Sequence, residues 1–320
     1  MLTSKLRFRR LGQVASGIAV LFLAAPASAW NATGHRAIAA IAYARLTPAA
    51  RAKADEFLKN HPDYGMFLTG APADPEGRAR AVFLAAAVWP DTIKGDPRFY
   101  DDLRKDAQPT PLLPGFPDMA RHMNWHYYDV PYSADGTPPK EAGVPNALSE
   151  IRRLMRETGD SSLRATPAGA TQLSYDLPWI EHIIGDLHQP LHCVSRFLRS
   201  QPNGDAGGNF VFVSPGENLH AFWDDLAGAD SSDVYIMRYA SEAVAAHPAA
   251  GDLEQNPQVW INEGFEIAKT DVYAFGLDTG SREAPIRLSE RYQAGAKSIA
   301  QARIALAGYR LAAVLNALLQ

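Results

Sequence analysis

Two pairs of a histidine and an aspartate, each separated by three residues, constrain this chain more than any other feature. The first pair is His182 and Asp186, and the second is His220 and Asp224. In an α-helix the fourth residue along lies on the same face, about one turn away. Each pair can therefore bind a metal ion between an imidazole and a carboxylate. With His192 close behind the first pair, the pattern predicts a site for several metal ions in a helical protein.

The composition suits a globular domain, and it limits both the molecules that the chain can bind and the residue types that can bind a metal. Hydrophobic residues make up 47% of the 320 residues, which is enough for a sizeable core. The net charge is -4, so the chain lacks the basic surplus that tight binding of duplex DNA requires. Cys193 is the only cysteine, so no intrachain disulfide can form and any metal must be bound by His, Asp and Glu. This donor set suits Zn²⁺ in a catalytic site.

The first 29 residues have the pattern of a secretory signal peptide. A basic segment precedes an apolar run over residues 17–25, and Ala27-Ser28-Ala29 forms a small-residue cleavage site. The alternative, an uncleaved anchor, is disfavoured because the run is short for a bilayer. The mature protein is expected to begin at Trp30, in the periplasm or outside the cell. Neither stable membrane association nor an obligate protein partner is expected.

Residues 30–320 are predicted to form one compact, mainly α-helical domain, because no repeat or linker divides them. Thr47-Pro48 and Thr166-Pro167 are each typical of a helix start, with threonine as the N-cap and proline as the first helical residue. Extended segments are expected over 125–130 and 210–213. Helices are expected over 37–45, 47–59, 78–88, 146–158, 166–187, 218–226, 232–245, 256–273 and 288–319.

Further polar residues stand in two short motifs before the first pair. Asp91 lies three residues before Lys94, and His126 is followed by Tyr127 and then by Asp129. These residue types can bind a metal and a charged, aromatic ligand. Each also has an ordinary alternative: an N-cap for Asp91, a core position for His126, and a loop position for Lys94 and Asp129.

The expected N-terminus adds another group of donors. The α-amine and carbonyl oxygen of Trp30 could chelate a metal, and an amine with a pKa near ~7.7–8.0 loses its proton readily. His35 lies five residues further on. His122, four residues before His126, is the rival ligand at that position. Asp205 is expected to be solvated.

Together these motifs resemble the S1/P1 nuclease family. In chain order, the resemblance rests on Trp30, Trp89-x-Asp91-x-x-Lys94, Trp125-His126-Tyr127-x-Asp129, His182-x3-Asp186-x5-His192 and Gly207-Gly208-Asn209 ahead of Asn218-Leu219-His220-x3-Asp224. It covers residues 30 to about 225. The chain departs from the fungal members, which carry disulfides and have Phe in place of Tyr127. The implied fold is the single helical domain that this family shares with zinc-dependent phospholipase C.

The resemblance implies three Zn²⁺ ions and a water, activated by the metal, that attacks phosphorus. Asp91, Asp186 and Lys94 would be the catalytic residues. The implied ligand sets are Asp91, His126, His182 and Asp186 for the first ion; His192, His220 and Asp224 for the second; and Trp30, His35 and a bridging Asp186 for the third.

The resemblance also implies how substrate is bound. Lys94 would neutralise charge on the phosphate, Tyr127 would stack on a base, Asp129 would hydrogen-bond the base edge, and Asn209 would line the same pocket. Such a pocket accepts only an unstacked base, so the implied substrates are single-stranded DNA, RNA and nucleotides. The implied products carry 5′-phosphates, and 3′-nucleotidase activity is a further expectation.

Two other functions fit part of the pattern. A zinc-dependent phospholipase C has a similar cluster, but that family usually has Glu where Asp224 stands here and needs a pocket for a lipid headgroup. A non-enzymatic zinc-binding protein would need neither an open coordination position nor Lys94. The combination of Tyr127 and Asp129 with Lys94 favours a nucleotide, so a nuclease is the expected function.

Overall fold

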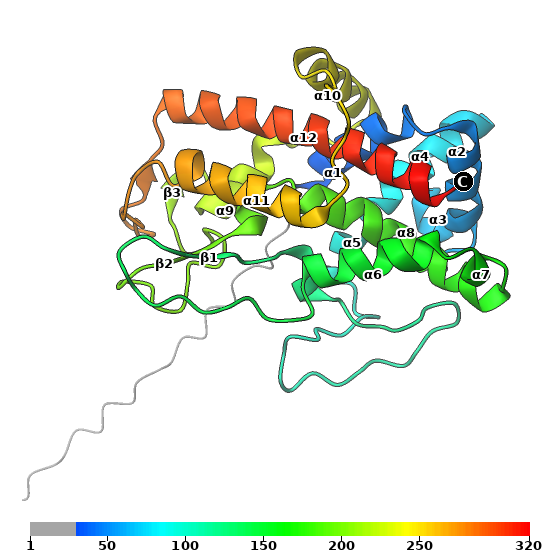
Figure 1. Cartoon of the computed structure of the whole chain (residues 1–320), viewed down its shortest axis with the longest axis horizontal. Coiled ribbons are helices and arrows are strands. Elements are labelled where there is room, and N and C mark those ends of the chain that lie inside the picture. The colour runs from blue at the N-terminus through cyan, green and yellow to red at the C-terminus, as the bar shows by residue number, and fades with distance from the viewer. Residues whose placement is uncertain (1–29) are drawn as a thin grey trace, which may run out of the picture.

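The expected mainly α architecture is confirmed. The computed structural model describes residues 30–320, so the predicted signal peptide over residues 1–29 lies outside the described residues. Within the described range most elements are helices, and the strands form two short parallel pairs (Figure 1). None of the described helices is long and apolar enough to cross a membrane.

The helices and strands lie in the following positions. The α-helices are α1 (Ala32–Tyr43), α2 (Pro48–Lys59), α3 (Tyr64–Phe67), α4 (Pro75–Ala86), α5 (Trp89–Thr92), α6 (Ala147–Gly159), α7 (Ser161–Arg164), α8 (Pro167–Asp186), α9 (Leu219–Asp224), α10 (Asp233–Ala246), α11 (Pro257–Ile267) and α12 (Glu290–Leu318). The 3-10 helices are η1 (Ile93–Gly95), η2 (Met123–His126), η3 (Pro190–Cys193) and η4 (Asp225–Ala227), and η5 (Ala268–Val272) is a π-helix. Strand β1 (Pro131–Ser133) pairs with β2 (Ser195–Phe197), and β3 (Val213–Ser214) pairs with β4 (Ile286–Arg287).

Both Thr-Pro pairs start helices as predicted. Thr47 Oγ1 accepts a hydrogen bond from the amide of Ala50 at 3.1 Å, at the start of α2. Thr166 Oγ1 accepts one from Gly169 at 3.0 Å, at the start of α8. The proline that follows each threonine costs no hydrogen bond, because the first helical N–H has no partner within the helix. Local chemistry therefore sets the starts of these two helices.

Helix α1 begins earlier than the expected residue 37. The side chain of Asn31 caps it, with Oδ1 accepting from the amide of Gly34 at 3.1 Å. Its Nδ2 donates to Asp225 Oδ1 and to the carbonyl of Gly228, so all of its polar atoms are engaged. The added turn places His35 inside the helix and in the protein interior.

The two predicted extended segments are largely wrong. Residues up to His126 form the 3-10 helix η2, and the strand starts only at Pro131. Between them the amide of Tyr128 donates to the carbonyl of His192 at 2.9 Å, a partner 64 positions away that the local pattern cannot reveal. Of residues 210–213, only Val213 lies in a strand.

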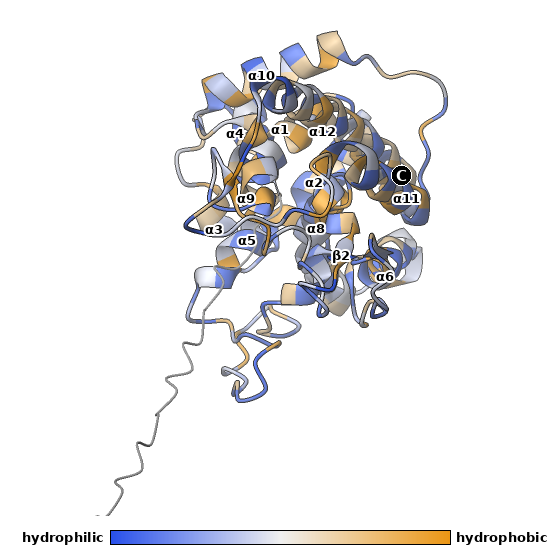
Figure 2. Ribbon diagram, turned by 90° about the vertical axis from the view of Figure 1, so that its left-hand side faces the viewer, coloured by the Kyte–Doolittle hydropathy of each residue, from blue (hydrophilic) through white to orange (hydrophobic). Residues whose placement is uncertain are grey.

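The interior is built around α1, α8 and α12, which pack on one another. Hydrophobic residues, orange in Figure 2, occur along these helices. Helix α12 lies across α1, and α8 lies between α6 and the other helices (Figure 1). Every residue of α8 from Leu173 to Asp186 is buried. The His and Asp residues in this stretch therefore lie in the core and need polar partners there.

Gly308 marks a close approach of α12 to α1, and we expect its replacement by alanine to destabilise the protein. A Cβ at this position would lie 2.6 Å from Cβ of Ile41, so the two helices would have to separate. We predict a decrease of about 1–3 kcal/mol in the free energy of unfolding for G308A, measured with urea. The matched control is G295A in the same helix, where a Cβ meets nothing within 4 Å, and it should be neutral or stabilising. Equal loss in both variants would contradict this account.

Candidate active site

The eight side chains predicted as metal ligands gather in one buried region. They come from α1, α5, η2, α8, η3 and α9. Within each of three groups, the atoms able to bind a metal all lie within 4.8 Å of one another. The groups are His35, Asp91 and His182; His126, His182 and Asp186; and His192, His220 and Asp224.

The two helical pairs have the geometry that their spacing predicts. Nε2 of His182 lies 3.3 Å from Oδ2 of Asp186 on α8, and Nε2 of His220 lies 3.5 Å from Oδ2 of Asp224 on α9. His192 lies beside the second pair, with its Nε2 3.0 Å from Nε2 of His220. The run from His182 to His192 thus contributes to two different groups of donors.

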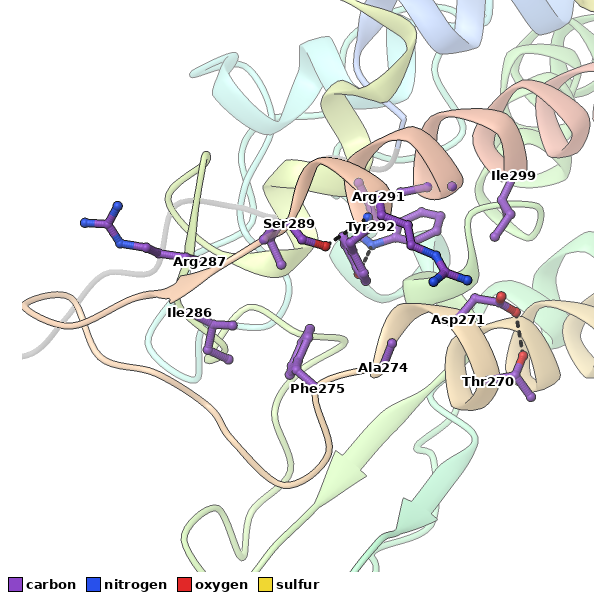
Figure 3. A pocket seen from close by; sticks show the side chains of 14 residues that line it. Thr270, Asp271, Ala274, Phe275, Ile286, Arg287, Ser289, Arg291, Tyr292 and Ile299 are labelled. Atoms are coloured by element: carbon purple, nitrogen blue, oxygen red, sulfur yellow. Dashed lines mark hydrogen bonds between the residues drawn. The ribbon is translucent and has the colours of Figure 1, made fainter.

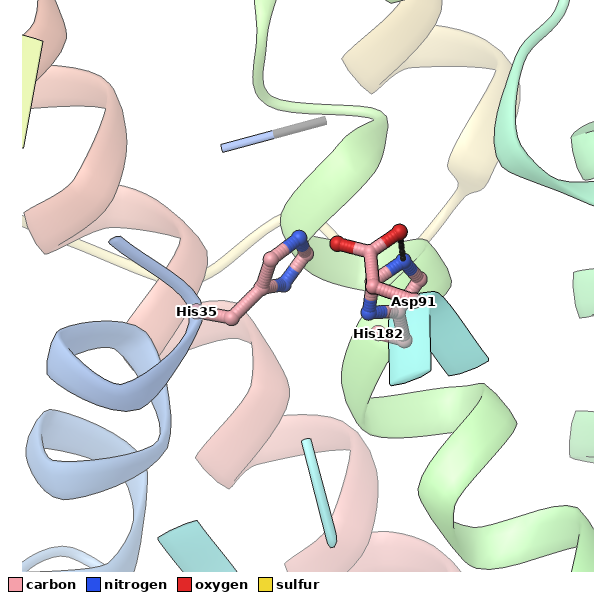
Figure 4. A group of neighbouring side chains, drawn as sticks. All are labelled: His35, Asp91 and His182. Atoms are coloured by element: carbon pink, nitrogen blue, oxygen red, sulfur yellow. Dashed lines mark ion pairs between the residues drawn. The ribbon is translucent and has the colours of Figure 1, made fainter. Parts of the chain in front are cut away.

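Asp186 lies between histidines that come from different parts of the chain. Its Oδ1 is 3.2 Å from Nε2 of His35, and its Oδ2 is 3.1 Å from Nδ1 of His126. Figure 4 shows His35 beside Asp91 and His182, and the rings of the two histidines stack with centroids 3.9 Å apart. The two carboxylate oxygens of Asp186 therefore face separate groups of donors.

Lys94 pairs with Asp91 at the edge of the cluster. Its Nζ lies 2.7 Å from Oδ1 of Asp91, and the lysine side chain is buried. Burial alone would raise the pKa of Asp91, but Lys94 and neighbouring histidines outweigh it and hold the pKa well below its usual range. Asp91 lies inside α5, where Val88 holds the N-cap position, so the capping alternative is excluded.

Burial sets the charge state of the other donors. It lowers the pKa of His126, His182 and His192, which favours the neutral imidazole that binds metals. Burial also raises the pKa of Asp186 to about 7 and that of Asp224 well above its usual value. Buried carboxylates are costly unless a cation compensates them.

Two buried ring nitrogens in the cluster, Nε2 of His126 and Nδ1 of His35, have no hydrogen-bond partner among residues 30–320. A group of neutral imidazoles and carboxylates with such atoms is chemically suited to hold Zn²⁺. The residues therefore fit a zinc centre.

Backbone carbonyls orient three of the histidines. In each, Nδ1 donates to a carbonyl oxygen, so the ring is fixed with Nε2 directed toward the other donors. The pairs are His182 with Ala87 at 2.8 Å, His192 with His126 at 2.6 Å, and His220 with Gly207 at 2.7 Å. Gly207 has a positive φ of 62°, and a Cβ there would lie 2.4 Å from the carbonyl oxygen of Leu191. Glycine at this position thus permits the backbone shape that supports His220.

Gln189 is a residue of the cluster that the sequence pattern did not identify. It is fully buried; its Nε2 donates to Asp224 Oδ1 at 2.7 Å, and its Oε1 accepts from the amide of Leu191 at 2.6 Å. It thereby holds one carboxylate oxygen of Asp224 and leaves the other toward His220. The only sequence signal is its position between the two predicted ligands Asp186 and His192.

We expect Q189A to weaken metal binding at the group formed by His192, His220 and Asp224. Loss of a residue that orients a metal ligand typically costs 10–100-fold in affinity. Zinc affinity measured by competition with a chelator should fall by about this factor, while the fold is retained. Gln258 on α11 is partly buried and lies outside the donor groups, so Q258A is the control and should leave the affinity unchanged. Unaltered zinc affinity in Q189A would remove Gln189 from the site.

Trp30 lies against this centre. Its side chain is fully buried, and the next residue, Asn31, donates its amide to the carbonyl of Asp224 at 3.1 Å. Trp30 also covers the first turn of α1, since a Cβ on Gly34 would lie 2.6 Å from its Cβ. The expected mature N-terminus thus packs on Gly34 in the first turn of α1 and is joined through Asn31 to the backbone of Asp224.

A cavity of about 410 Å³ lies next to the cluster and contains two of the predicted substrate-binding residues, Tyr127 and Asp129. Burial raises the pKa of Tyr127 to about 12, so its phenol is neutral. Burial and the nearby Asp205 raise the pKa of Asp129 to about 7. Asn209, the third predicted residue, does not line this cavity; its Nδ2 donates to the carbonyl of Ala206 at 2.8 Å.

Asp205 was expected to be solvated, and this expectation is wrong. The residue is fully buried and accepts hydrogen bonds from the amide of Arg196 at 2.9 Å and from the hydroxyl of Tyr273 at 2.8 Å. It anchors the loop that continues to Gly207 and Asn209. The rival ligand His122 lies outside the three donor groups, where it pairs with Asp118 at 3.0 Å.

A second cavity, of about 460 Å³, lies between η5, β4 and the start of α12 (Figure 3). It contains none of the predicted site residues, although Trp223 in its wall precedes Asp224. Nε1 of Trp223 donates to the hydroxyl of Tyr292 at 3.0 Å, which donates to the carbonyl of Val272 at 2.8 Å. These hydrogen bonds connect α9 to α12 and η5 at the wall of this cavity.

Comparison with known proteins identifies the family. The sequence model of the S1/P1 Nuclease family matches residues 30–320. Nuclease S1 of Aspergillus oryzae is 26% identical, over 93% of this chain and 94% of its own length. Endonuclease 3 of Arabidopsis thaliana is 25% identical over 74% of this chain and 77% of its own, and Endonuclease 1 of the same plant is 24% identical over 79% and 85%. With a match across all the residues that contribute the metal donors, the chain belongs to the S1/P1 nuclease family and is a phosphodiester hydrolase.

Proposed function

We propose that the protein is a zinc-dependent endonuclease that hydrolyses single-stranded DNA and RNA and leaves 5′-phosphate ends. It also removes the phosphate from 3′-nucleotides in this proposal. The observation that carries it is the position of the cavity with Tyr127 and Asp129 directly beside His126 of the donor cluster. A base bound there would place its phosphate within reach of the metal centre.

The proposed centre holds three Zn²⁺ ions. When bound, they supply a nucleophilic water at neutral pH and positive charge at the phosphate and the leaving oxygen. The separate orientations of the two Asp186 oxygens support a bridging role for that residue. The proposed ligand sets are Asp91, His126, His182 and Asp186; His192, His220 and Asp224; and the α-amine and carbonyl of Trp30 with His35 and Asp186.

The chain's own residues bind and orient the substrate. Lys94 directs its ammonium to the edge of the cluster, where it neutralises charge on the phosphate oxygens. Tyr127 stacks on a base, and Asp129 hydrogen-bonds the base edge. Asn209 contributes to substrate binding from the loop after Asp205. A base can enter the cavity only when it is unpaired and unstacked, which accounts for the preference for single strands.

We further propose that the protein works in the periplasm or outside the cell. The signal-peptide pattern of residues 1–29 supports export, and cleavage after Ala29 would produce the free amine of Trp30. Nucleic acids and nucleotides are the proposed partners, with no stable membrane association and no obligate protein partner.

The test uses the mature protein, beginning at Trp30, with zinc restored. It is incubated with a single-stranded oligonucleotide, the matching duplex, RNA, a 3′-nucleotide and phosphatidylcholine vesicles. We expect fast cleavage of the single strands to 5′-phosphate products, release of phosphate from the 3′-nucleotide and no action on the lipid. An intact single strand would refute the proposal, and cleavage of phosphatidylcholine would support the phospholipase alternative.

A further inference from the structure

The cavity beside the cluster contains a carboxylate, that of Asp129, with no hydrogen-bond partner among the described residues. Asp129 lines its wall, and among residues 30–320 no hydrogen bond reaches the carboxylate of Asp129. Because the carboxylate is partly buried, it has lost part of its water without gaining a protein donor. A ligand with N–H groups would satisfy it.

Asn124 also lines the cavity, but its side-chain amide is not open to a ligand. Its Nδ2 donates to the carbonyl of Pro145 at 2.6 Å, so its donor side is engaged. Its Oδ1 is buried and has no hydrogen-bond partner in the described chain. In this arrangement a ligand therefore reaches neither polar atom of the Asn124 amide.

The other polar side chains of the cavity distinguish less well between the nucleobases. Nζ of Lys140 donates to Oδ1 of Asn203 at 2.7 Å, so the pair is engaged at the rim. The hydroxyl of Ser195 can donate or accept. Glu141 also lines the cavity but is exposed, so its carboxylate keeps its water. Recognition of a base edge therefore depends mainly on Asp129.

The base edges differ in how well they match the two oxygens of one carboxylate. Guanine offers adjacent donors on its Watson–Crick edge, N1–H and the N2 amine, which a carboxylate can accept together. Adenine and cytosine each offer one amine beside an acceptor nitrogen, and uracil and thymine offer one N–H between two carbonyls. We infer that this cavity selects guanine over the other bases, with the Asp129 carboxylate accepting from N1–H and from the N2 amine. This inference rests on the proposed function, which places a base in the cavity.

The charges around the cavity agree with this role. Asp129 is ionised above a pKa of about 7, which reflects its burial and the neighbouring Asp205. Asp205 is held by Arg196 and Tyr273, so it accepts no hydrogen bond from the base in this proposal. Binding experiments at pH 8 therefore test the carboxylate form of Asp129.

The first experiment measures binding of free nucleosides to the mature, zinc-loaded protein by calorimetry at pH 8. Guanosine should bind most tightly, and inosine, which lacks the N2 amine, should bind several-fold more weakly. Adenosine and 1-methylguanosine should bind about tenfold more weakly or worse, as is typical when a bidentate base contact is lost. 7-Deazaguanosine keeps the Watson–Crick edge and should match guanosine. Equal binding of guanosine, adenosine and 1-methylguanosine would overturn the inference.

The second experiment uses D129N, which replaces one acceptor oxygen with a donor amine of the same size. The ratio of guanosine to adenosine affinity should fall by about tenfold or more, because asparagine matches the donor–acceptor edge of adenine. D252N, the same change at an exposed aspartate that does not line the cavity, should leave the ratio unchanged. An equal decrease in affinity for all nucleosides in D129N would show that Asp129 does not distinguish between the bases.

The experiments can refute guanine selection and the proposed nuclease activity independently of each other. If the wild-type protein cleaves single strands and binds all nucleosides alike, guanine selection is wrong and the nuclease proposal stands. If it binds guanosine selectively and leaves single strands intact, the nuclease proposal is wrong.

Discussion

The D186N variant is expected to lose most of its activity and part of its bound metal. Asp186 faces His35 with one carboxylate oxygen and His126 with the other, so the proposed centre uses both oxygens. An asparagine has one oxygen and an NH₂ group that repels a cation. Even residues that only orient metal ligands account for 10–100-fold effects, and we therefore expect kcat to fall by about 1000-fold or more. Zinc per protein, measured by mass spectrometry of the metal, should fall as well.

The same helix offers a matched control for this variant. Asp176 is also fully buried on α8, and burial raises its pKa to about 7, as for Asp186. Its Oδ1 accepts from Gln172 at 2.7 Å, and it lies outside the donor groups. D176N should therefore keep its zinc and its activity. If D176N and D186N lose activity equally, the loss reflects the folding of α8 and not the metal centre.

Keeping one additional residue before Trp30 is expected to remove one metal ion and most of the activity. The extra peptide bond converts the α-amine into an amide, which cannot bind zinc without losing a strongly held proton. Trp30 is fully buried against α1, so the added residue has no alternative place beside His35. We expect a decrease of about 100-fold or more in kcat, the scale seen when a group that stabilises transition-state charge is removed.

An equal addition after Gln320 is the control for this experiment, because it leaves the centre unchanged. Mass spectrometry should define each N-terminus, and metal analysis should give about one zinc fewer for the protein extended before Trp30. Full activity and a full complement of zinc in that protein would remove Trp30 from the mechanism.

Local chemistry predicted the features that depend on neighbours along the chain. A helix brings residues four apart onto one face, so the pairs His182–Asp186 and His220–Asp224 could be recognised from spacing alone. The N-caps of α2 and α8 follow the same logic, because Thr47 and a following proline contain all the information for a helix start. These elements could be predicted with their boundaries.

Features that depend on distant partners could not be predicted in this way. Gln189 contacts Asp224, 35 residues away, and Asp205 accepts from Tyr273, 68 residues away. Nothing in the neighbouring sequence distinguishes either residue from a solvated one. The carbonyl groups that orient the histidines have no sequence signal at all, because every residue has such a group. The conformation of the segment before β1 was predicted wrongly for a similar reason, because its backbone donates a hydrogen bond to the carbonyl of the distant His192.

The position of α12 has a consequence for the order of events during synthesis. This helix occupies the end of the chain, yet it packs on α1 and α8, which carry His35 and His182, with Gly308 in contact range of Ile41. All the metal donors lie before residue 225, so they leave the ribosome well before the helix that covers their supporting elements. A stable catalytic centre therefore requires α12 to have been synthesised, and a product that stops before α12 would be inactive.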